Sequence, residues 1–530
     1  MLNFLIVVPR YVSKVGAYYE FPLGLAYISS ALKSKGFNVF CLNLNHQSDS
    51  VATAIKNAIR QNHIDVVCTG GLSPHYHKID DILKETKKVS PEIITIIGGG
   101  LFGSEPEIML RSLAADYGVF EEGEETIVEL ATALENATDP KQVKGIMFVD
   151  DHNNIVTTKL RDSIQDLDSI PWPDYEGLGI REFLDMQMPY NSYYLYPFDN
   201  PRLMPMISTR SCPFSCTFCY HPIGKVYRKR SLDDFFKELE YLIDSYNINM
   251  VSLLDELFSV KKERMLEFCA RIKSYNIKWI AQMRVGDIDK ETISALKESG
   301  CFYISFGLES ISSEVLKSMK KKIKSEQIDI ALKLTRNANI GIQGNFIFGD
   351  LAETEETAQE TLDWWKVNIQ YQINLGFIIP YPGCENYKYA VKNGLIKDKL
   401  AYIKTGCPPI NLTKLPQAQY AKLQRKVAYY QDAYRISGKI ISQKKIQENE
   451  SHKEEAYSLT VQCPYCNSIS IYKNMPKIYY SIYDRLACRN CNQKFALKGS
   501  INLLYLMKER IRNRPELYAL IKRVRAVLNK

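Results

Sequence analysis

Short apolar runs alternate with amphipathic stretches through the first 135 residues of the chain. The runs cover residues 2–8, 38–44, 64–70, 93–97 and 117–120, and an amphipathic segment of helical period follows each of the first three and the last. Strands joined by helices of this kind predict right-handed crossovers and a parallel, doubly wound sheet over residues 1–140. Such a sheet binds ligands at the carboxyl ends of its strands.

A second alternating series begins after a predicted hairpin and linker at 141–200. Strands are predicted at 203–209, 250–254, 278–284, 302–307, 341–348 and 373–379, with helices between them. Six consecutive strand–helix units over 201–395 predict a partial (β/α)6 barrel whose chemistry lies at the C-terminal ends of the strands. The alternation then stops. Residues 414–446 have a helical pattern, and we assign 396–455 to a helical extension and linker.

The composition places the chain among globular proteins. It has 530 residues, of which 45% are hydrophobic and 24% charged, and this excludes a disordered, collagenous or coiled-coil protein. No apolar run reaches the length of a membrane span, and the first residues lack the features of a signal peptide. We therefore expect a cytoplasmic protein.

The net charge of +8 is too small by itself to indicate a nucleic-acid binder. Most of the excess lies in residues 501–530, which have eight Lys and Arg against two Glu and an apolar side. A basic amphipathic tail of this kind either lies on an anionic membrane face, which would make the protein peripheral at the inner membrane, or packs on the protein with its basic side in solvent.

Thirteen cysteines, an odd number in a large chain without a signal peptide, argue against a disulfide framework and for metal or redox chemistry. Cys212, Cys216 and Cys219 form a Cys-x3-Cys-x2-Cys loop directly after the first barrel strand. Three thiolates on one loop can bind three irons of a four-iron cluster. The fourth iron then keeps the open position that a catalytic metal site needs.

Four further cysteines form two Cys-x2-Cys knuckles in residues 456–500. Cys463 and Cys466 are separated by 21 residues from Cys488 and Cys491. This spacing predicts a zinc-ribbon-like module with four thiolates around one metal. Zinc is the favoured occupant, and a rubredoxin-like iron with an electron-transfer role is the alternative. The remaining six cysteines are scattered and are expected to be mostly small buried hydrophobes.

The cysteine loop resembles the signature of the radical S-adenosylmethionine (SAM) superfamily. The resemblance implies a [4Fe-4S] cluster on Cys212, Cys216 and Cys219, with SAM bound at the open iron and cleaved to methionine and a 5′-deoxyadenosyl radical. A flavodoxin or ferredoxin would reduce the cluster. By position, the residues expected to contact SAM are Phe218, Arg284, Gly307, Glu309 and Ser310.

The front domain resembles the Rossmann-like cobalamin-binding domain of one large radical SAM subclass. The match rests on Ile97-Gly98-Gly99-Gly100, on Glu122-Gly123-Glu124-Glu125 and on residues 22–28. The histidine motif that binds cobalt from below in other cobalamin domains is absent, and His75 and His77 are expected to be loop residues. The resemblance implies cobalamin at the strand ends, and the residues expected there are Gly70, Ser73, Gly98, Gly99 and Gly123.

Together these features predict a radical SAM enzyme that methylates an unactivated carbon of a small molecule, a natural product or a lipid-linked substrate with cobalamin. The alternative hypothesis for the enzyme is a radical cyclisation, oxidation or carbon–carbon coupling without methyl transfer. A reading from another class makes the ribbon and tail a docking module for nucleic acid or a protein partner. An RNA methylthiotransferase is disfavoured, because only Cys41 and Cys68 precede residue 200.

Overall fold

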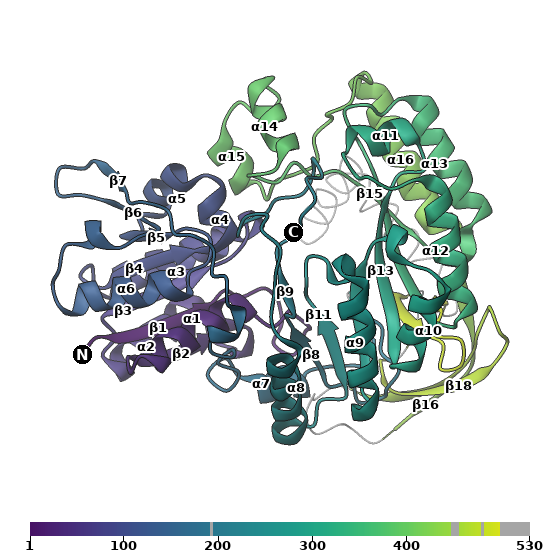
Figure 1. Cartoon of the computed structure of the whole chain (residues 1–530), viewed down its shortest axis with the longest axis horizontal. Helices are drawn as coiled ribbons and strands as arrows, with labels where there is room; N and C mark the ends of the chain where they lie inside the picture. Colours follow the sequence, from purple (N-terminus) through teal and green to yellow (C-terminus); the bar gives the residue numbers. More distant parts are fainter. Residues whose placement is uncertain (191–193, 447–454, 477, 479–481, 499–530) are drawn as a thin grey trace, which may run out of the picture. The chain divides into compact units, whose positions relative to one another are not determined.

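The structure, a computed structural model, describes residues 1–190, 194–446, 455–476, 478 and 482–498. The chain forms two compact units. The first joins Met1–Gln187 with Pro201–Tyr434, and the second joins Met188–Asn200 with the residues from Arg435 onward. Figure 1 labels the helices and strands of both. The predicted basic tail at 501–530 lies outside the described residues.

The N-terminal part of the first unit is built on a seven-stranded sheet of order β2-β1-β3-β4-β5-β6-β7. Its strands are β1 (Asn3–Val8), β2 (Asn38–Asn43), β3 (Val66–Gly70), β4 (Ile94–Gly98), β5 (Tyr117–Val119), β6 (Ile146–Val149) and β7 (Ile155–Thr157). The first five are parallel, and β6 and β7 add an antiparallel hairpin at one edge. The predicted doubly wound sheet and hairpin are confirmed.

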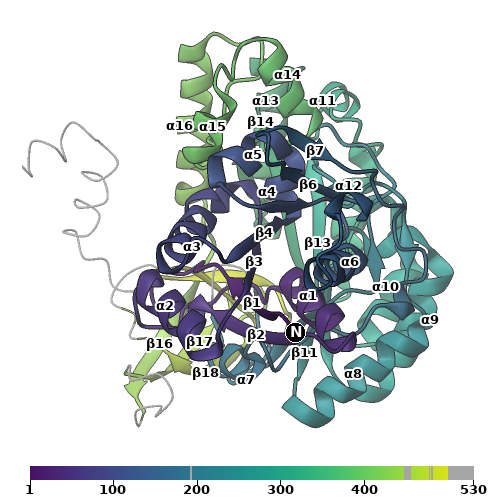
Figure 2. The same ribbon diagram turned by 90° about the vertical axis from the view of Figure 1, so that its left-hand side faces the viewer.

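Helices cover both faces of this sheet, as Figure 2 shows. They are α1 (Leu23–Ser34), α2 (Val51–Asn62), α3 (Tyr76–Val89), α4 (Gly99–Ser104), α5 (Pro106–Leu113) and α6 (Glu124–Glu135). In β1, Phe4 and Ile6 pack in the core with α1 and α6, whereas Leu5 and Val7 pack in the core with α2 and α3. Burial on both faces explains why this strand is an unbroken apolar run.

A second sheet follows in the same unit, with six strands, all parallel, in the order β15-β14-β13-β12-β11-β8. Its strands are β8 (Leu203–Met206), β11 (Met250–Leu253), β12 (Lys278–Met283), β13 (Cys301–Glu309), β14 (Gly341–Phe348) and β15 (Asn374–Phe377). Because β8 and β15 are edge strands, the barrel is open, and the predicted partial (β/α)6 barrel is confirmed.

The helices of the barrel alternate with its strands. They are α8 (Leu232–Tyr246), α9 (Lys262–Ile272), α10 (Lys290–Glu298), α11 (Ser313–Ser318), α12 (Ser325–Asn337) and α13 (Glu355–Val367). A short helix α7 (Ile180–Asp185) lies in the preceding linker, and α14 (Glu385–Lys392), α15 (Lys399–Lys404) and α16 (Gln417–Ala433) follow the last strand. The barrel core is aromatic and aliphatic, with Trp279 and Phe268 among its fully buried side chains.

The helix predicted over 414–446 is wrong in its second half. Residues Gln417–Ala433 form α16, but Ser437–Lys445 form strand β16. This strand pairs antiparallel with β17 (Tyr457–Gln462) and parallel with β20 (Lys494–Lys498). Strand β17 follows after a linker and β20 is distant in sequence, so hydrogen bonds to residues outside the segment decided a structure that its local pattern left ambiguous.

The second unit is a five-stranded sheet of order β18-β17-β16-β20-β19. Its two remaining strands are β18 (Ile469–Met475) and β19 (Ile482–Ala487). Leu459, Val461, Tyr472 and Phe495 form its small core together with the knuckle cysteines Cys463, Cys488 and Cys491. The module is therefore larger than the 456–500 ribbon predicted from the cysteines, because β16 belongs to it.

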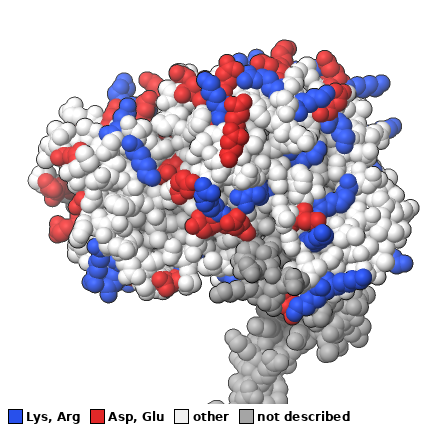
Figure 3. Space-filling view, turned by 90° about the horizontal axis from the view of Figure 1, so that it is seen from below, with Lys and Arg blue, Asp and Glu red and all other residues white. Residues whose placement is uncertain are grey.

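The surface charges of the described residues are mixed in sign. On the face drawn in Figure 3, basic and acidic side chains intermingle over the white background, without a broad field of one sign. Within the described ranges, no helix is both long enough and apolar enough to cross a bilayer.

Candidate active site

The three cysteines of the Cys-x3-Cys-x2-Cys motif lie on one loop after β8. A two-residue hairpin of β9 (Thr209–Arg210) and β10 (Arg228–Lys229) closes this loop at its base. At its centre, the Thr217 amide donates to the Met319 carbonyl (3.1 Å), and the Asn386 amide donates to the Thr217 carbonyl (3.0 Å). Backbone contacts to segments that follow β13 and β15 therefore hold the cysteine loop over the C-terminal end of the barrel sheet.

The thiols interact with one another. A hydrogen bond from Cys219 lowers the pKa of Cys216 to about 6, and the same bond raises the pKa of Cys219. Burial raises the pKa of Cys212, and the charge of Cys216 acts in the same direction. Thiolates are the form that binds iron, and a cubane needs each cysteine on a different iron rather than all on one atom. The donor set and its grouping on one loop fit a [4Fe-4S] cluster.

An ion pair lies beside this loop that the sequence did not indicate. The Lys321 ammonium is 2.6 Å from the Glu309 carboxylate, and both side chains are largely buried. Burial disfavours the charged ammonium, but Glu309 and the thiols of the loop raise the pKa of Lys321. The same ammonium lies 5.8 Å from the ring centroid of Phe218. Glu309 and Phe218, both predicted to contact SAM, therefore lie at one place, together with Lys321.

Gly307 has a steric role at the same place. A Cβ atom at this position would lie 2.5 Å from both the Glu309 carboxylate and the Lys321 ammonium. Both atoms are the far ends of flexible side chains, so a side chain at this position would displace the ion pair and leave the backbone in place.

Arg284 and Ser310 have partners within the protein. Arg284 stacks over Phe214, 3.6 Å from the ring centroid, and donates to the carbonyls of Lys321 (3.3 Å) and Lys322 (2.7 Å). Ser310 is buried, lies 3.1 Å from the Thr361 hydroxyl and accepts from the Ser312 amide. In this structure Arg284 positions the loop that presents Lys321, and Ser310 fixes the turn after β13. Their contacts to SAM stay predictions.

The two adjacent acidic residues after β11, Asp255 and Glu256, have different roles. Asp255 is buried and accepts from the Ser208 amide (2.7 Å), the Ser208 hydroxyl and the Thr209 amide (2.9 Å). It braces the base of the cysteine loop, and burial raises its pKa. Its neighbour Glu256 lies 3.0 Å from the His221 imidazole, two residues after the last cluster cysteine.

The glycines predicted to contact cobalamin lie at the ends of β3 and β4 and at the start of α6. A Cβ at Gly70 would lie 2.7 Å from the Gly98 carbonyl, and one at Gly123 would lie 2.8 Å from Ile28. Gly99 has a left-handed backbone, with φ of +79°. The backbone of the chain therefore requires Gly70 and Gly99, whereas at Gly123 the end of the Ile28 side chain would have to move aside. A Cβ at Gly98 would lie 3.8 Å from the Val119 carbonyl, an ordinary contact, so packing of the chain does not require a glycine there.

The polar residues of this edge differ in exposure, with Ser73 buried, His75 half-buried and His77 exposed. Ser73 is buried in the turn after β3. The His75 imidazole accepts from the Leu72 amide (3.3 Å), and burial lowers its pKa to about 4. His77 lies 2.7 Å from the Lys404 carbonyl. His75 ends the short turn before α3, and His77 is an exposed residue in the first turn of α3; both have partners within the protein. A glycine-lined strand end without an imidazole ligand fits a large planar ring bound from one side.

A buried ion network joins this domain to the base of the cysteine loop. Glu122 lies 2.7 Å from Arg210 and 2.5 Å from Arg228, and Glu124 lies 2.6 Å from Arg210. All four side chains are buried. Arg210 and Arg228 face each other across the β9–β10 hairpin. Glu122 and Glu124 therefore hold both ends of the cysteine loop through ion pairs, a role that the sequence did not reveal.

Tyr220 makes a second link. It follows Cys219 directly, and its ring fills a notch formed by Gly100 and Gly103 of α4 and by Gly383 after β15. A Cβ at Gly383 would lie 2.3 Å from the ring. The end of the cysteine loop thus packs against the helix that begins at the glycine turn of β4.

The second unit contains the four knuckle cysteines at metal-binding distance. All four sulfur atoms lie within 4.8 Å of one another, with Cys463 3.8 Å from Cys491 and Cys466 3.6 Å from Cys488. With metal–sulfur bonds of about 2.3 Å, a tetrahedral site spaces its sulfurs by about 3.8 Å. The geometry therefore fits one tetrahedral metal, as the spacing predicted.

Backbone and side-chain donors surround these sulfurs. The amides of Tyr465, Asn490 and Cys491 donate to cysteine sulfurs at 3.4 Å. The Ser468 hydroxyl lies 3.1 Å from Cys466 and 3.4 Å from Cys488. Donors of this kind stabilise thiolates, which a metal site needs.

Comparisons with known proteins agree with this geometry. The family model described as B12 binding domain matches residues 10–131, and the one described as Radical SAM superfamily matches residues 206–364. An uncharacterized methyltransferase of Pyrococcus horikoshii is 28% identical over 418 residues, which cover 77% of this chain and 87% of that protein. The anaerobic magnesium-protoporphyrin IX monomethyl ester cyclase of Rubrivivax gelatinosus is 28% identical over 65% of this chain and 62% of its own length.

Two solved structures share the fold. The radical SAM methyltransferase TsrM from Kitasatospora setae, with tryptophan and a SAM analogue bound, has a TM-score of 0.61 at 18% identity, over 74% of this chain and 77% of that chain. The cobalamin-dependent SAM radical enzyme OxsB has a TM-score of 0.59 at 18% identity, over 80% of this chain and 61% of that chain.

Proposed function

Because this chain belongs to the radical SAM superfamily, in the subclass with a cobalamin-binding domain, we propose that it is a cobalamin-dependent methyltransferase that methylates an unactivated carbon of a small molecule. One observation carries the proposal. The loop with Cys212, Cys216 and Cys219 is clasped at its base by Glu122 and Glu124 of the B12-type domain. The two cofactor-binding parts are thus built into one compact unit.

When bound, the cluster, SAM and cobalamin supply one-electron cleavage of SAM and carriage of a methyl group. The chain's own residues hold and orient these groups. Cys212, Cys216 and Cys219 are the cluster ligands. Lys321 is a cation of the right kind for the SAM carboxylate, and Glu309 is an acceptor for ribose hydroxyls or the SAM amino group. The ring of Phe218 beside them offers an apolar face to the adenine.

The arrangement also protects a radical from water. The loop base is sealed by buried ion pairs, and Tyr220 fills the glycine notch beside the last cysteine. A radical that abstracts hydrogen from a substrate needs such exclusion, because solvent access opens side reactions.

The experiment is anaerobic purification with iron and cobalt quantified, followed by SAM turnover with candidate substrates. We expect iron and cobalt in the protein and two SAM products, 5′-deoxyadenosine and S-adenosylhomocysteine. Deoxyadenosine alone, from a protein without cobalt, would refute methylation and would favour a radical cyclisation, oxidation or coupling.

For the second unit we propose a structural zinc ion on Cys463, Cys466, Cys488 and Cys491. The sulfur spacing near that of a tetrahedral site supports it, and zinc is the commonest occupant of such sites. Metal analysis of the purified protein should give one zinc per chain. One extra iron per chain beyond the cluster, with the red colour of an iron–thiolate site, would instead support the rubredoxin-like alternative.

A further inference from the structure

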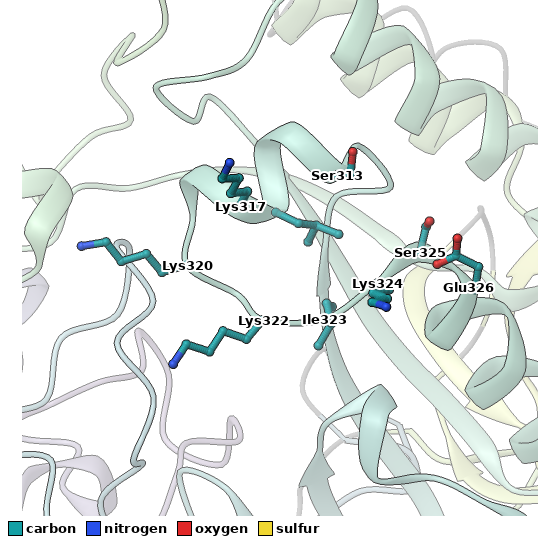
Figure 4. Close-up of a pocket in the computed structure, with 9 residues that line it drawn as sticks. Ser313, Lys317, Lys320, Lys322, Ile323, Lys324, Ser325 and Glu326 are labelled. Carbon is teal, nitrogen blue, oxygen red and sulfur yellow. The ribbon is translucent and has the colours of Figure 1, made fainter.

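A basic hollow lies on the rim of the barrel, next to the proposed SAM site. It has a volume of about 600 Å³ and is formed by α11, the loop 319–324 and the first turn of α12. Lys317, Lys320, Lys322 and Lys324 line it against one acid, Glu326, which leaves three positive charges. In Figure 4, Lys320 and Lys322 extend from the loop to the same side, with Lys317 above them. A volume of this size suits a small molecule.

Three of these lysines are not used by the fold. Lys320 pairs with Glu385 at 2.7 Å. Over the part of the chain that the structure describes, Lys317, Lys322 and Lys324 form no ion pair, and all three are exposed. Cations gathered around one hollow repel each other and do not stabilise the folded chain by their charge. An anion in the hollow would convert that repulsion into attraction.

The backbone of the loop is arranged to present them. Lys320 and Lys322 both have a left-handed backbone with φ of 54°, which is unusual for a residue with a long side chain. This conformation lets Lys321 face Glu309 while Lys320 and Lys322 line the hollow. Strain of this kind persists only where surrounding structure holds it, often at a functional site. Here Arg284 holds it, through the carbonyls of Lys321 and Lys322.

The hollow and the proposed SAM site therefore share one short loop. The Met319 carbonyl accepts from the Thr217 amide, in the centre of the cysteine loop, and Lys321 lies beside Cys216 and Cys219. A ligand held by Lys320 and Lys322 would be anchored within a few residues of the reacting centre. An anionic tail held beside the reacting centre would position the reacting carbon of the substrate.

We propose that this lysine pocket binds the oxyanion group of the substrate, a phosphate-type or multiple-carboxylate group. This inference rests on the proposed function, because it takes the bound molecule to be the substrate that is methylated. It assigns that substrate to the class of small anionic molecules. Lysines bind such groups as point charges on flexible stems, so several of them adapt to one tetrahedral or branched anion.

The test is calorimetric titration of the full chain with inorganic pyrophosphate, and in a separate arm with succinate. The test variant is Lys317→Gln, Lys322→Gln and Lys324→Gln combined, which leaves Lys320 with its partner Glu385 and Lys321 with Glu309. The matched control removes three exposed lysines outside the hollow, by Lys333→Gln, Lys388→Gln and Lys392→Gln. Both variants lose the same net charge.

We expect the test variant to bind pyrophosphate about 100-fold more weakly than the unaltered chain, at roughly five-fold per lysine, and the control variant to bind as the unaltered chain does. A charge-preserving version with arginine at the same three positions should restore binding. Binding of succinate but not of pyrophosphate would identify the bound oxyanion group as a carboxylate group and not a phosphate-type group.

Equal weakening in both variants, or no binding of either probe, would overturn the proposal. Its failure is separable from that of the proposed function, which is read from cobalt content and SAM products. Pyrophosphate binding lost only in the test variant, in a protein that transfers no methyl group, would leave the anion pocket standing and refute methylation.

Discussion

Replacing Glu122 by alanine is expected to loosen the cysteine loop and to destabilise the protein. The carboxylate is buried and accepts three hydrogen bonds, from Arg210 (2.7 Å), from Arg228 (2.5 Å) and from the Ile164 amide (2.9 Å). The variant keeps both guanidinium groups buried. Arg210 retains Glu124, whereas Arg228 retains only neutral oxygens, the Ile164 carbonyl and the Ser211 hydroxyl among them.

The size of the effect follows from these contacts. Three hydrogen bonds to the charged carboxylate, at about 1.5 kcal/mol each, give about 4.5 kcal/mol. That value agrees with the loss of about 3–5 kcal/mol when one partner of a buried ion pair is removed. Because Arg210 and Arg228 form the two strands at the base of the loop, the loss falls on the segment that carries the cluster ligands.

The assay is urea unfolding of the full chain, followed by fluorescence, together with iron content after anaerobic reconstitution. Glu125→Ala is the matched control, because Glu125 belongs to the same motif but is exposed and pairs with Arg161 at the surface. A surface pair contributes at most about 1 kcal/mol. Equal stability of the two variants, with full iron content in Glu122→Ala, would refute the role assigned to the network.

Four further changes test other parts of the structure. Cys216→Ala should lose cluster iron and SAM cleavage, measured as deoxyadenosine, and cleavage at the unaltered rate would refute the cluster assignment. Lys321→Met removes the cation beside Cys216 and should raise KM for SAM about 10- to 100-fold, since a charge-assisted bond contributes about 1.5–3 kcal/mol; an unchanged KM contradicts its assigned role. Gly383→Ala should lower the thermal midpoint of unfolding, because φ is +97° and the Tyr220 ring occupies the space of the new Cβ. Combining it with Tyr220→Ala should recover part of the lost stability, and no recovery would contradict the packing of the ring against Gly383. Cys466→Ser should lose the zinc of the second unit, and a full zinc content in that variant would place the metal elsewhere.

The sequence predicted the two sheets well because their strands are buried on both faces. Such strands are continuous apolar runs, and the predicted barrel strands at 250–254, 278–284 and 341–348 differ from β11, β12 and β14 by at most one residue. The cysteine motifs were equally legible, since ligand spacing is a local property of the chain. Strand β16 was misassigned because its partners β17 and β20 lie outside the segment, β20 far away in sequence, and a local pattern does not contain them.

In the candidate site, too, the sequence identified single residues and motifs, whereas the fold decided which charged residues are paired. Three consecutive lysines at 320–322 are indistinguishable in sequence from a solvated run, and only the left-handed turns at Lys320 and Lys322 decide that Lys321 faces Glu309. Likewise, the Glu122-Gly123-Glu124 motif was legible as part of a ligand-binding strand end. Its two carboxylates became an ion clasp only when Arg210 was brought to them from 86 and 88 residues away.

What the sequence determined by itself was therefore everything that is local in the chain. The alternation of apolar and polar positions, the spacing of seven cysteines and the glycine turns sufficed for two α/β domains, a four-iron loop and a four-thiolate site. The tertiary structure decided how distant charges are paired, and so which charged residues support the reaction site and which remain available to a ligand. Burial is the physical reason, because a charge in the interior requires a partner and the fold alone determines which one is in reach.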